Sequence, residues 1–223
     1  IGMDSFPVDI GVARDVEGER ILRRKIRYGT ADMTKEPAMT REEAVRALET
    51  GIEMAEWCAA QGYRLVCGGE MGIGNTTTSA AVTAVLTGAN VRDVTGRGAG
   101  LSSEGLERKV RAIEAALKLH QPDSNDPVDI LHKVGGLDIA GMAGFYLGAA
   151  ACGLPVVLDG VISCAAALIA VRLCPAVRDY LIAAHQSAEP AGRLLLEALG
   201  YTPFISAGMR LGEGTGAVAA VAM

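Results

Sequence analysis

Apolar positions along this chain follow two patterns, one typical of helices and one typical of buried strands. Between residues 44 and 59, apolar side chains recur every three or four positions, which is the spacing of one helix face. Thr40 and Glu43 precede this segment in a capping-box pattern, and Gly62 follows it as a stop signal. Short apolar runs without alternation predict strands at 64–68, 154–158, 180–184 and 204–206.

Further helical segments fill the stretches between these strands. Asp138 is expected to cap the third of them, and residues 121–127 are expected to form a polar loop. Strands and helices that alternate, with strands apolar on both faces, predict an α/β fold with a mostly parallel sheet and helices on both faces. Residues 1–40 are expected to be a loop-rich segment with one strand near 8–12, and residues 41–223 to form the α/β core. The expected helices lie at about 76–86, 103–119, 138–151, 161–173 and 191–199, with another after residue 216.

The composition fits one sizeable domain and argues against several kinds of partner. Half of the 223 residues are apolar, which is enough for a large core. The net charge is -5, no long run of lysine or arginine occurs, and aromatic residues make up 4%, so neither nucleic acid nor a membrane surface is an expected partner. Residues 139–158 are uncharged and long enough to span a membrane, but their glycines and Pro155 favour a buried helix followed by a buried strand.

The cysteines and histidines predict neither disulfides nor a metal site. The five cysteines are scattered among apolar residues and form no C-x-x-C pair, so free thiols in a reducing cytoplasm are expected. The three histidines lie far apart and show no ligand spacing. We therefore expect a cytoplasmic protein with no metal and no cofactor.

Three glycine-rich loops carry the candidate chemistry, at 68–78, 95–100 and 210–216. The first follows an apolar strand and precedes a helix, an order that suits phosphate, because glycine lets the backbone approach an anion that the first-turn amides attract. None of the loops matches a standard nucleotide signature: the third glycine of G-x-G-x-x-G and the Lys-Ser/Thr of a Walker loop are missing. For a single such loop, a simple tight turn is an equally good interpretation.

Two glutamates, Glu70 and Glu213, are each flanked by glycine before a predicted helix. Either could simply favour a helix N-terminus, which is worth about 0.3–1 kcal/mol. Their matching settings favour a functional interpretation instead, because a carboxylate walled by backbone and apolar groups has a raised pKa and can act as a general base near neutrality.

For three polar side chains, the sequence allows either a role in ligand binding or a purely structural role. Lys109, about two turns into its helix, could reach back to a phosphate or could be an exposed lysine. Ser187, at the end of a strand, could meet a ligand or cap a helix, and no G-x-S-x-G elbow surrounds it. Arg97, between two glycines, could be structural or could meet an anion.

These segments resemble a known family. Residues 69–77 (GEMGIGNTT) and 210–217 (RLGEGTGA) resemble the motifs of the nicotinate-nucleotide:dimethylbenzimidazole phosphoribosyltransferase family of cobalamin nucleotide-loop assembly. The resemblance spans nearly the whole chain, from about Asp9 to the C-terminus. It is supported by 37–40 (PAMT), 95–98 (TGRG), 134–136 (VGG) and 158–160 (LDG).

The resemblance implies a Rossmann-like sheet with a small second domain, a homodimer, and transfer of 5-phosphoribosyl from nicotinate mononucleotide to 5,6-dimethylbenzimidazole or a related base. It implies that Glu213 is the general base and that Glu70 assists it. The products would be α-ribazole 5′-phosphate and nicotinate, with inversion at the anomeric carbon. The candidate substrate-binding residues are Gly72, Gly74, Asn75, Thr76, Gly98, Lys109, Asp159, Ser187 and Leu211, of which Gly72, Gly98, Lys109 and Ser187 are implied to meet the nucleotide, chiefly its phosphate.

The chain departs from this family in length. Members are considerably longer, mainly at the N-terminus, so we expect the small second domain and part of the base pocket to be incomplete here. This motivates an alternative, a truncated relative that binds nucleotide or base without turnover. A dinucleotide-dependent oxidoreductase is a weaker alternative, because G-x-G-x-x-G and a ribose-binding acid are absent.

Overall fold

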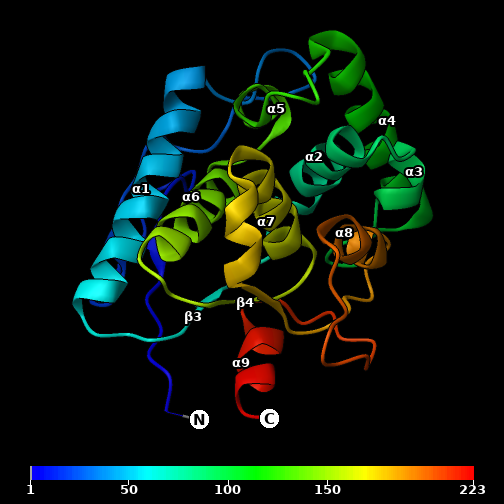
Figure 1. Ribbon diagram of the computed structural model, residues 1–223. Helices are drawn as coiled ribbons and strands as arrows, with labels where there is room; N and C mark the ends of the chain where they lie inside the picture. The colour runs from blue at the N-terminus through cyan, green and yellow to red at the C-terminus, as the bar shows by residue number, and fades with distance from the viewer. Residues whose placement is uncertain (1) are drawn as a thin grey trace.

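The protein is described by a computed structural model, which covers residues 2–223 (Figure 1). A small sheet precedes the main body, which alternates helices and strands. The elements are β1 (Val8–Asp9), β2 (Leu22–Arg23), α1 (Arg41–Ala60), β3 (Val66–Gly68), α2 (Thr76–Thr87), α3 (Val91–Val94), α4 (Ser103–His120), α5 (Pro127–Val134), α6 (Leu137–Ala151), β4 (Val156–Leu158), α7 (Val161–Leu173), the 3-10 helix η1 (Pro175–Tyr180), β5 (Leu181–Ala183), α8 (Ala191–Leu199) and α9 (Thr215–Val221).

The main sheet has three parallel strands in the order β3-β4-β5. Val156 of β4 pairs with Val66 of β3 and with Leu181 of β5, and all three residues of β4 are buried. Helices α6 and α7 pack on one face, while α9 contacts β3 and β4 from the other (Figure 1). This confirms the predicted α/β fold with a parallel sheet and helices on both faces.

Helices α1 and α6 cross at close range because glycines line their contact. A Cβ on Gly144 would overlap the carbonyl oxygen of Leu48, and one on Gly51 would overlap the carbonyl oxygen of Gly141. Only glycine allows two helix backbones to approach this closely. The uncharged segment 139–158 is therefore a buried helix and a buried strand, as predicted. Among the described residues, no helix combines the length and the apolar character needed to cross a bilayer.

The start of α1 follows the sequence prediction in detail. The Thr40 hydroxyl accepts a hydrogen bond from the Glu43 backbone amide at 3.1 Å, and the Glu43 carboxylate accepts one from the Thr40 amide at 2.8 Å. This reciprocal capping box satisfies two amides that the helix itself cannot use.

Several local predictions were wrong. Helix α5 was not predicted; it begins at Pro127 and is capped by the Asp126 side chain, both of which are start signals that the polar-loop interpretation hid. Gly136, not Asp138, is the N-cap of α6; Asp138 lies in the first turn, where its carboxylate accepts from the Asn75 side chain. The strand expected at 204–206 is reduced to a single bridge between His185 and Ile205.

The N-terminal segment contains one strand more than predicted. Residues Val8–Asp9 and Leu22–Arg23 pair in parallel, and Asp9 is buried against Lys25 at 2.8 Å. The Lys25 ammonium also donates to the carbonyl oxygens of Val12 and Arg14, which pins the turn between the strands. The charge-dense sequence after residue 12 hides such a short strand. The proposed domain boundary at residue 40 stays a prediction.

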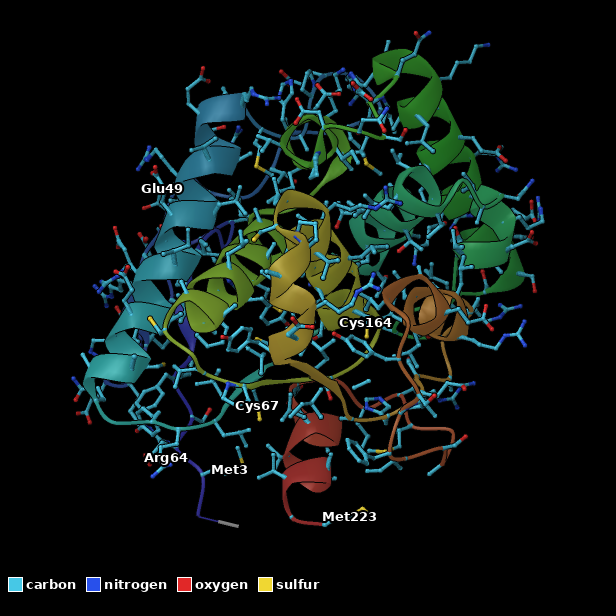
Figure 2. All side chains as sticks on the ribbon, viewed as in Figure 1. Met3, Glu49, Arg64, Cys67, Cys164 and Met223 are labelled. Carbon is cyan, nitrogen blue, oxygen red and sulfur yellow. The ribbon has the colours of Figure 1, made fainter. Side chains whose placement is uncertain are left out.

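All five cysteines lie among the described residues 2–223 and carry free thiols; Cys58 and Cys164 are buried, whereas Cys152 and Cys174 are exposed. Figure 2 labels Cys67 on β3 and Cys164 on α7. Burial raises the pKa of Cys67 to about 11 and that of Cys164 to about 12, with the charge of Asp159 adding to both. These thiols are therefore protonated near neutral pH and act as small apolar side chains.

Candidate active site

A cleft of about 320 Å³ lies where the three parallel strands end. The carboxyl ends of parallel strands meet at one edge of a sheet, which is where α/β proteins bind ligands. Here β3 leads into the first glycine loop, β4 into Asp159, and β5 into the segment that carries Ser187. The cleft is lined by Glu70, Met71, Gly72, Ile73, Thr76, Ala80, Val94, Gly96, Gly98, Ala99, Asp159, Gly160, Val161, Ile162, Ser163, His185, Ser187, Glu189, Arg210, Leu211, Gly212 and Glu213.

The first and third glycine loops lie against each other in this cleft. The Glu213 amide donates to the Glu70 carbonyl oxygen at 2.8 Å. A Cβ on Gly69 would lie 2.7 Å from the Gly214 nitrogen, so Gly69 has to be glycine for the loops to touch. The two glutamates, distant in sequence, therefore come from adjacent backbones and line one cavity.

The Glu70 carboxyl is partly buried, and its surroundings act on its protonation in both directions. Burial raises its pKa above the ordinary value of 4.5, and the charge of Asp138 adds to this effect. Hydrogen bonds from Asn75 and from the Gly72 amide oppose it but do not cancel it. A carboxyl with a raised pKa can exchange a proton closer to neutrality than an exposed one can.

Glu213 occupies a strained backbone conformation. Its φ is +58°, between Gly212 at +75° and Gly214 at +77°, so three successive residues are left-handed. For a residue with a Cβ, this conformation costs about 1–3 kcal/mol and persists only when neighbouring contacts hold it. Those contacts are the bond to the Glu70 carbonyl and the turn bond from the Thr215 amide to the Gly212 carbonyl, 3.0 Å. The Glu213 side chain itself is exposed at the cleft.

Asp159, at the end of β4, holds the backbone that follows Glu213. Its carboxylate accepts from the amides of Gly214, Gly216 and Ala217 at 3.1, 2.8 and 3.2 Å. The side chain is buried, and these amides are first-turn donors of α9 that have no partner within the helix. Asp159, a predicted substrate-binding residue, thus lines the cleft, but its carboxylate is engaged in hydrogen bonds to these backbone amides.

Lys109 is buried below the cleft, not exposed. Its ammonium donates to Thr76 Oγ1 at 2.9 Å and to the Gly96 carbonyl at 3.0 Å. Burial lowers its pKa, and the charge of Glu189 opposes that effect. An ammonium has three hydrogens, so one remains beyond these two contacts. Thr76 lies in the cleft wall, which places the lysine immediately behind it.

The remaining predicted positions divide into two groups. Gly72, Gly98, Ser187 and Leu211 line the cleft. Gly98 has a φ of +54°, and a Cβ there would lie 2.8 Å from Thr76 Oγ1, so this position requires glycine on two counts. The Ser187 hydroxyl also accepts from the Glu189 amide at 3.3 Å, a bond within the turn that precedes α8. The N-cap of α8 is Pro190, without a side-chain cap bond, so the capping interpretation of Ser187 is wrong.

Gly74 and Asn75 are outside the residues that line the cleft. Asn75 is buried, and its amide donates to Asp138, so it supports the first loop from behind. Arg97 turns away as well: its guanidinium donates to the Leu101 carbonyl at 2.7 Å and to Ser103 Oγ at 3.1 Å. The structural interpretation of Arg97 is therefore correct.

His185 and Glu189 were missed as candidates. His185 follows β5 as Glu70 follows β3, and this position after a strand was the available signal. Its ring is buried against Gly216, with Nδ1 lacking a hydrogen-bond partner at 4.0 Å from Asp159 Oδ1. Metal-ligand spacing does not reveal it, and residues 2–223 hold no group of three or more His, Cys, Asp or Glu side chains suited to a metal.

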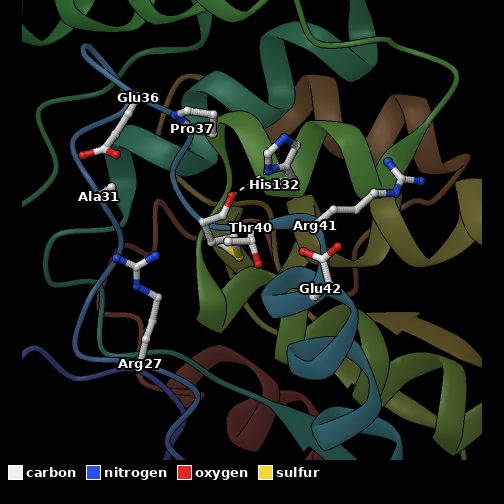
Figure 3. Close-up of a pocket in the computed structure, with 9 residues that line it drawn as sticks. Arg27, Ala31, Glu36, Pro37, Thr40, Arg41, Glu42 and His132 are labelled. Atoms are coloured by element: carbon white, nitrogen blue, oxygen red, sulfur yellow. Dashed lines mark hydrogen bonds between the residues drawn. The ribbon is translucent and has the colours of Figure 1, made fainter.

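A second hollow, of about 430 Å³, lies beside the start of α1 (Figure 3). Its two arginines already pair within the protein: Arg27 with Glu43 at 2.9 Å and Arg41 with Asp126 at 2.8 Å. The His132 ring bonds to the Met39 carbonyl at 2.6 Å, the contact that Figure 3 draws as a dashed line. This hollow is lined by the segment before α1, the start of α1 and His132 of α5, whereas the cleft lies at the strand ends, where α/β proteins bind ligands. The cleft is therefore the candidate active site.

Comparison with known proteins shows the family of this chain. A family model described as phosphoribosyltransferase matches residues 1–223. The chain is 51% identical over 219 residues to the nicotinate-nucleotide–dimethylbenzimidazole phosphoribosyltransferase of Acetivibrio thermocellus, covering 98% of this chain and 62% of the relative. It is 52% identical over 224 residues to the protein of the same name from Geobacter sulfurreducens, covering 100% and 64%.

Solved structures give the same result. A crystal structure of CobT from Thermus thermophilus matches with a TM-score of 0.91 at 43% identity, over 97% of this chain and 65% of that one. The chain thus spans somewhat less than two thirds of the length of the relatives that it matches. From the family match and these relatives, we conclude that the chain belongs to the phosphoribosyltransferase family.

Proposed function

We propose that this protein transfers 5-phosphoribosyl from nicotinate mononucleotide to 5,6-dimethylbenzimidazole or a related base. The products are α-ribazole 5′-phosphate and nicotinate. The observation that carries the proposal is the meeting of Glu70 and Glu213 in one cleft, with Lys109 directly behind its wall. The names of the relatives give the two substrates, and the family membership gives the class of reaction.

Glu213 is the proposed general base. It takes the N–H proton of the benzimidazole while the other ring nitrogen attacks the anomeric carbon. The bond from that carbon to nicotinate breaks, and its electron pair returns to the pyridine nitrogen, which loses its positive charge. Removing the proton prevents positive charge from building up on the attacking ring, and the exposed side chain of Glu213 is free to receive it.

Glu70 is the proposed assistant of this step. Its carboxyl lies in the same cleft and has a raised pKa because of burial. In its ionised form it would stabilise the cationic sugar that forms as the bond to nicotinate breaks. In its protonated form it would donate to the incoming base, so its protonation state decides which role dominates.

The phosphate is proposed to lie near Gly72, Gly98 and Ser187, on the Thr76 side of the cleft. The third ammonium hydrogen of Lys109 and the Ser187 hydroxyl supply donors there. Glu189 also lines the cleft, and its carboxylate lies so close to Gly96 that a Cβ there would overlap it. Lys109 donates to the carbonyl of the same glycine. Glu189 thereby balances the charge of Lys109.

The test is to incubate the purified chain with nicotinate mononucleotide and 5,6-dimethylbenzimidazole and to identify products by mass spectrometry. The proposal predicts α-ribazole 5′-phosphate and nicotinate in equal amounts, and a large loss of turnover in Glu213→Ala. Unchanged turnover in that variant would refute the role of Glu213. Calorimetry that shows nucleotide binding without product would instead favour a non-catalytic binding protein.

We further propose that the protein acts as a homodimer in the cytoplasm. The free thiols of the five cysteines suit a reducing compartment. Exposed apolar side chains at the mouth of the cleft, among them Met71, Ile73 and Leu211, suit contact with an aromatic base or with further protein. Light scattering of the purified chain tests the dimer.

A further inference from the structure

A buried serine hydroxyl connects the two glutamate loops, and the proposed chemistry leaves it without a role. Ser163 lies in the first turn of α7 and is 2% exposed. Its Oγ is 2.8 Å from the Tyr146 hydroxyl, 3.1 Å from the Asp159 backbone nitrogen and 3.4 Å from the Gly68 carbonyl oxygen. It therefore touches the ends of two neighbouring strands, β3 and β4.

The hydrogen-bonding capacity of this hydroxyl is used completely. A serine hydroxyl offers one hydrogen and two lone pairs. One set of directions satisfies all three contacts: the Asp159 amide and the Tyr146 hydroxyl donate to Ser163, and Ser163 donates to the Gly68 carbonyl. Losing such a group in a buried place leaves several partners unsatisfied at once.

Tyr146 fixes the serine from the opposite side. It lies on α6, is fully buried, and packs so closely on Gly68 that a Cβ there would overlap its ring. Within residues 2–223, the one other hydrogen-bond contact of its hydroxyl is the Met142 sulfur at 3.8 Å, which is a weak acceptor. The bond to Ser163 is thus the main polar contact of this side chain.

Two of the three contacts of Ser163 lead to the glutamate loops. Gly68 is followed directly by Gly69 and Glu70, so the bond to its carbonyl sets where the first loop departs from β3. The bond from the Asp159 amide to Ser163 fixes the backbone position of Asp159. The carboxylate of Asp159 in turn accepts from the amides that follow Glu213.

We propose that Ser163, oriented by Tyr146, is a positioning residue that keeps the Glu70 and Glu213 loops in register across the cleft. This inference rests on the proposed function for its catalytic consequence. Its structural part concerns only the two loops and is measurable without substrate. Ser163 borders the cleft, but its hydroxyl is engaged by Tyr146, the Asp159 amide and the Gly68 carbonyl, so both residues act through the backbone and through Asp159.

The experiment compares Ser163→Ala with Ser79→Ala, using hydrogen exchange of the substrate-free chain. Ser79 is a matched control, because it is a fully buried serine on α2 whose Oγ has no hydrogen-bond partner. We expect Ser163→Ala to speed exchange in residues 68–76 and 210–217 by about tenfold or more, while α1 keeps its protection. Ser79→Ala should change neither loop.

The second readout is steady-state kinetics. Ser163→Ala should lower kcat about 10–100-fold and leave the KM for nicotinate mononucleotide within about twofold, because small displacements of catalytic groups cost rate more than binding. Tyr146→Phe, which keeps the ring, should shift both readouts in the same direction by less. Tyr201→Phe is its control, because the Tyr201 hydroxyl donates to the carbonyl of Arg178 in η1 and contacts neither glutamate loop through that bond.

The outcomes separate the two proposals. Exchange in both loops that matches Ser79→Ala would overturn the positioning role, whatever the activity. Exchange that rises equally in α1 would also overturn it, since Ser163 would then support stability in general. Faster exchange confined to the two loops, in a chain whose wild type makes no product, would uphold the positioning role and refute the proposed function.

Discussion

The two glutamate loops look alike in sequence but differ in how the fold holds them. Glu70 leaves the sheet directly after β3, and its carboxyl folds back on the Gly72 amide in a partly buried place. Glu213 follows no strand, and it is exposed with a φ of +58°. Its amide donates to the Glu70 carbonyl, and the amide of the next residue, Gly214, donates to Asp159. Similar Gly-Glu motifs thus produce one carboxyl tuned by burial and one presented by backbone strain.

The difference assigns the two acids different tasks. A carboxyl whose pKa is raised by burial suits a changeable protonation state, whereas an exposed carboxylate on a strained loop suits direct contact with a ligand that enters the cleft. The variants below separate the burial of Glu70 from the exposed position of Glu213. They are ordered by the size of the expected effect.

Glu213→Gln should cause the largest loss. Removing the base while keeping the shape should lower kcat about 10²–10⁴-fold, because general-base catalysis contributes on that order. Nucleotide affinity by calorimetry should stay within about twofold. Glu197→Gln, an exposed α8 residue paired only with Arg193, is the control. A kcat near wild type would show that Glu213 is not the base.

Gly69→Ala should force the two loops apart. The added Cβ would lie 2.7 Å from the Gly214 nitrogen, so the backbones have to shift. We expect a loss of about 1–3 kcal/mol in the free energy of unfolding by urea, together with a fall in kcat of up to about 10²-fold.

Gly160→Ala is the matched control for that change, because a Cβ there meets nothing within 4 Å and φ is -94°. It should alter stability by less than about 0.5 kcal/mol. If Gly69→Ala behaves like Gly160→Ala, the contact between the loops does not constrain the site.

Asp159→Asn should destabilise the Glu213 loop and leave the Glu70 loop largely unchanged. The amide nitrogen of asparagine cannot accept, so at least one of the three α9 amides loses its partner, at a cost of about 1–3 kcal/mol in unfolding free energy. Hydrogen exchange should rise in 213–217 more than in 68–76. The exposed Asp93→Asn is the control, and equal exchange in both loops would contradict the anchoring role.

Glu70→Gln should have the smallest effect, and one that depends on pH. The folded-state pKa of Glu70 lies above its ordinary 4.5, so the folded protein binds this proton more tightly than the unfolded chain. The stability that this provides is complete below 4.5 and is lost as pH rises through the folded-state pKa.

The glutamine variant lacks this loss. Compared with wild type, the variant should therefore be more stable at pH 7 than at pH 4. Urea denaturation of both proteins at both pH values measures this difference. A relative stability that is constant or falls between pH 4 and pH 7 would show that burial does not dominate at Glu70.

Much of this arrangement could be predicted from local sequence signals. The α1 cap, the buried strands and the positions of the glycine loops depend on neighbouring residues, and the structure confirms them. The meeting of the loops follows from parallel strands ending at one edge of a sheet.

The missed features depend on contacts between distant residues. The burial of Lys109 requires Thr76 and Gly96, and the role of Asp159 requires the amides of α9, so no local pattern reveals either. His185 was overlooked because its type was tested only against metal-ligand spacing. Helix α5 was hidden because Asp126 and Pro127, its start signals, are also typical of loops.

A double-mutant cycle on kcat tests most directly whether the two carboxylates act as one site. Wild type, Glu70→Gln, Glu213→Gln and the double variant are compared at saturating substrates. If both groups serve the same step in one cleft, the double variant should lose less than the product of the single losses, by up to the factor that Glu70→Gln alone loses. Single losses that multiply fully in the double variant would show that the glutamates act independently and would contradict the account.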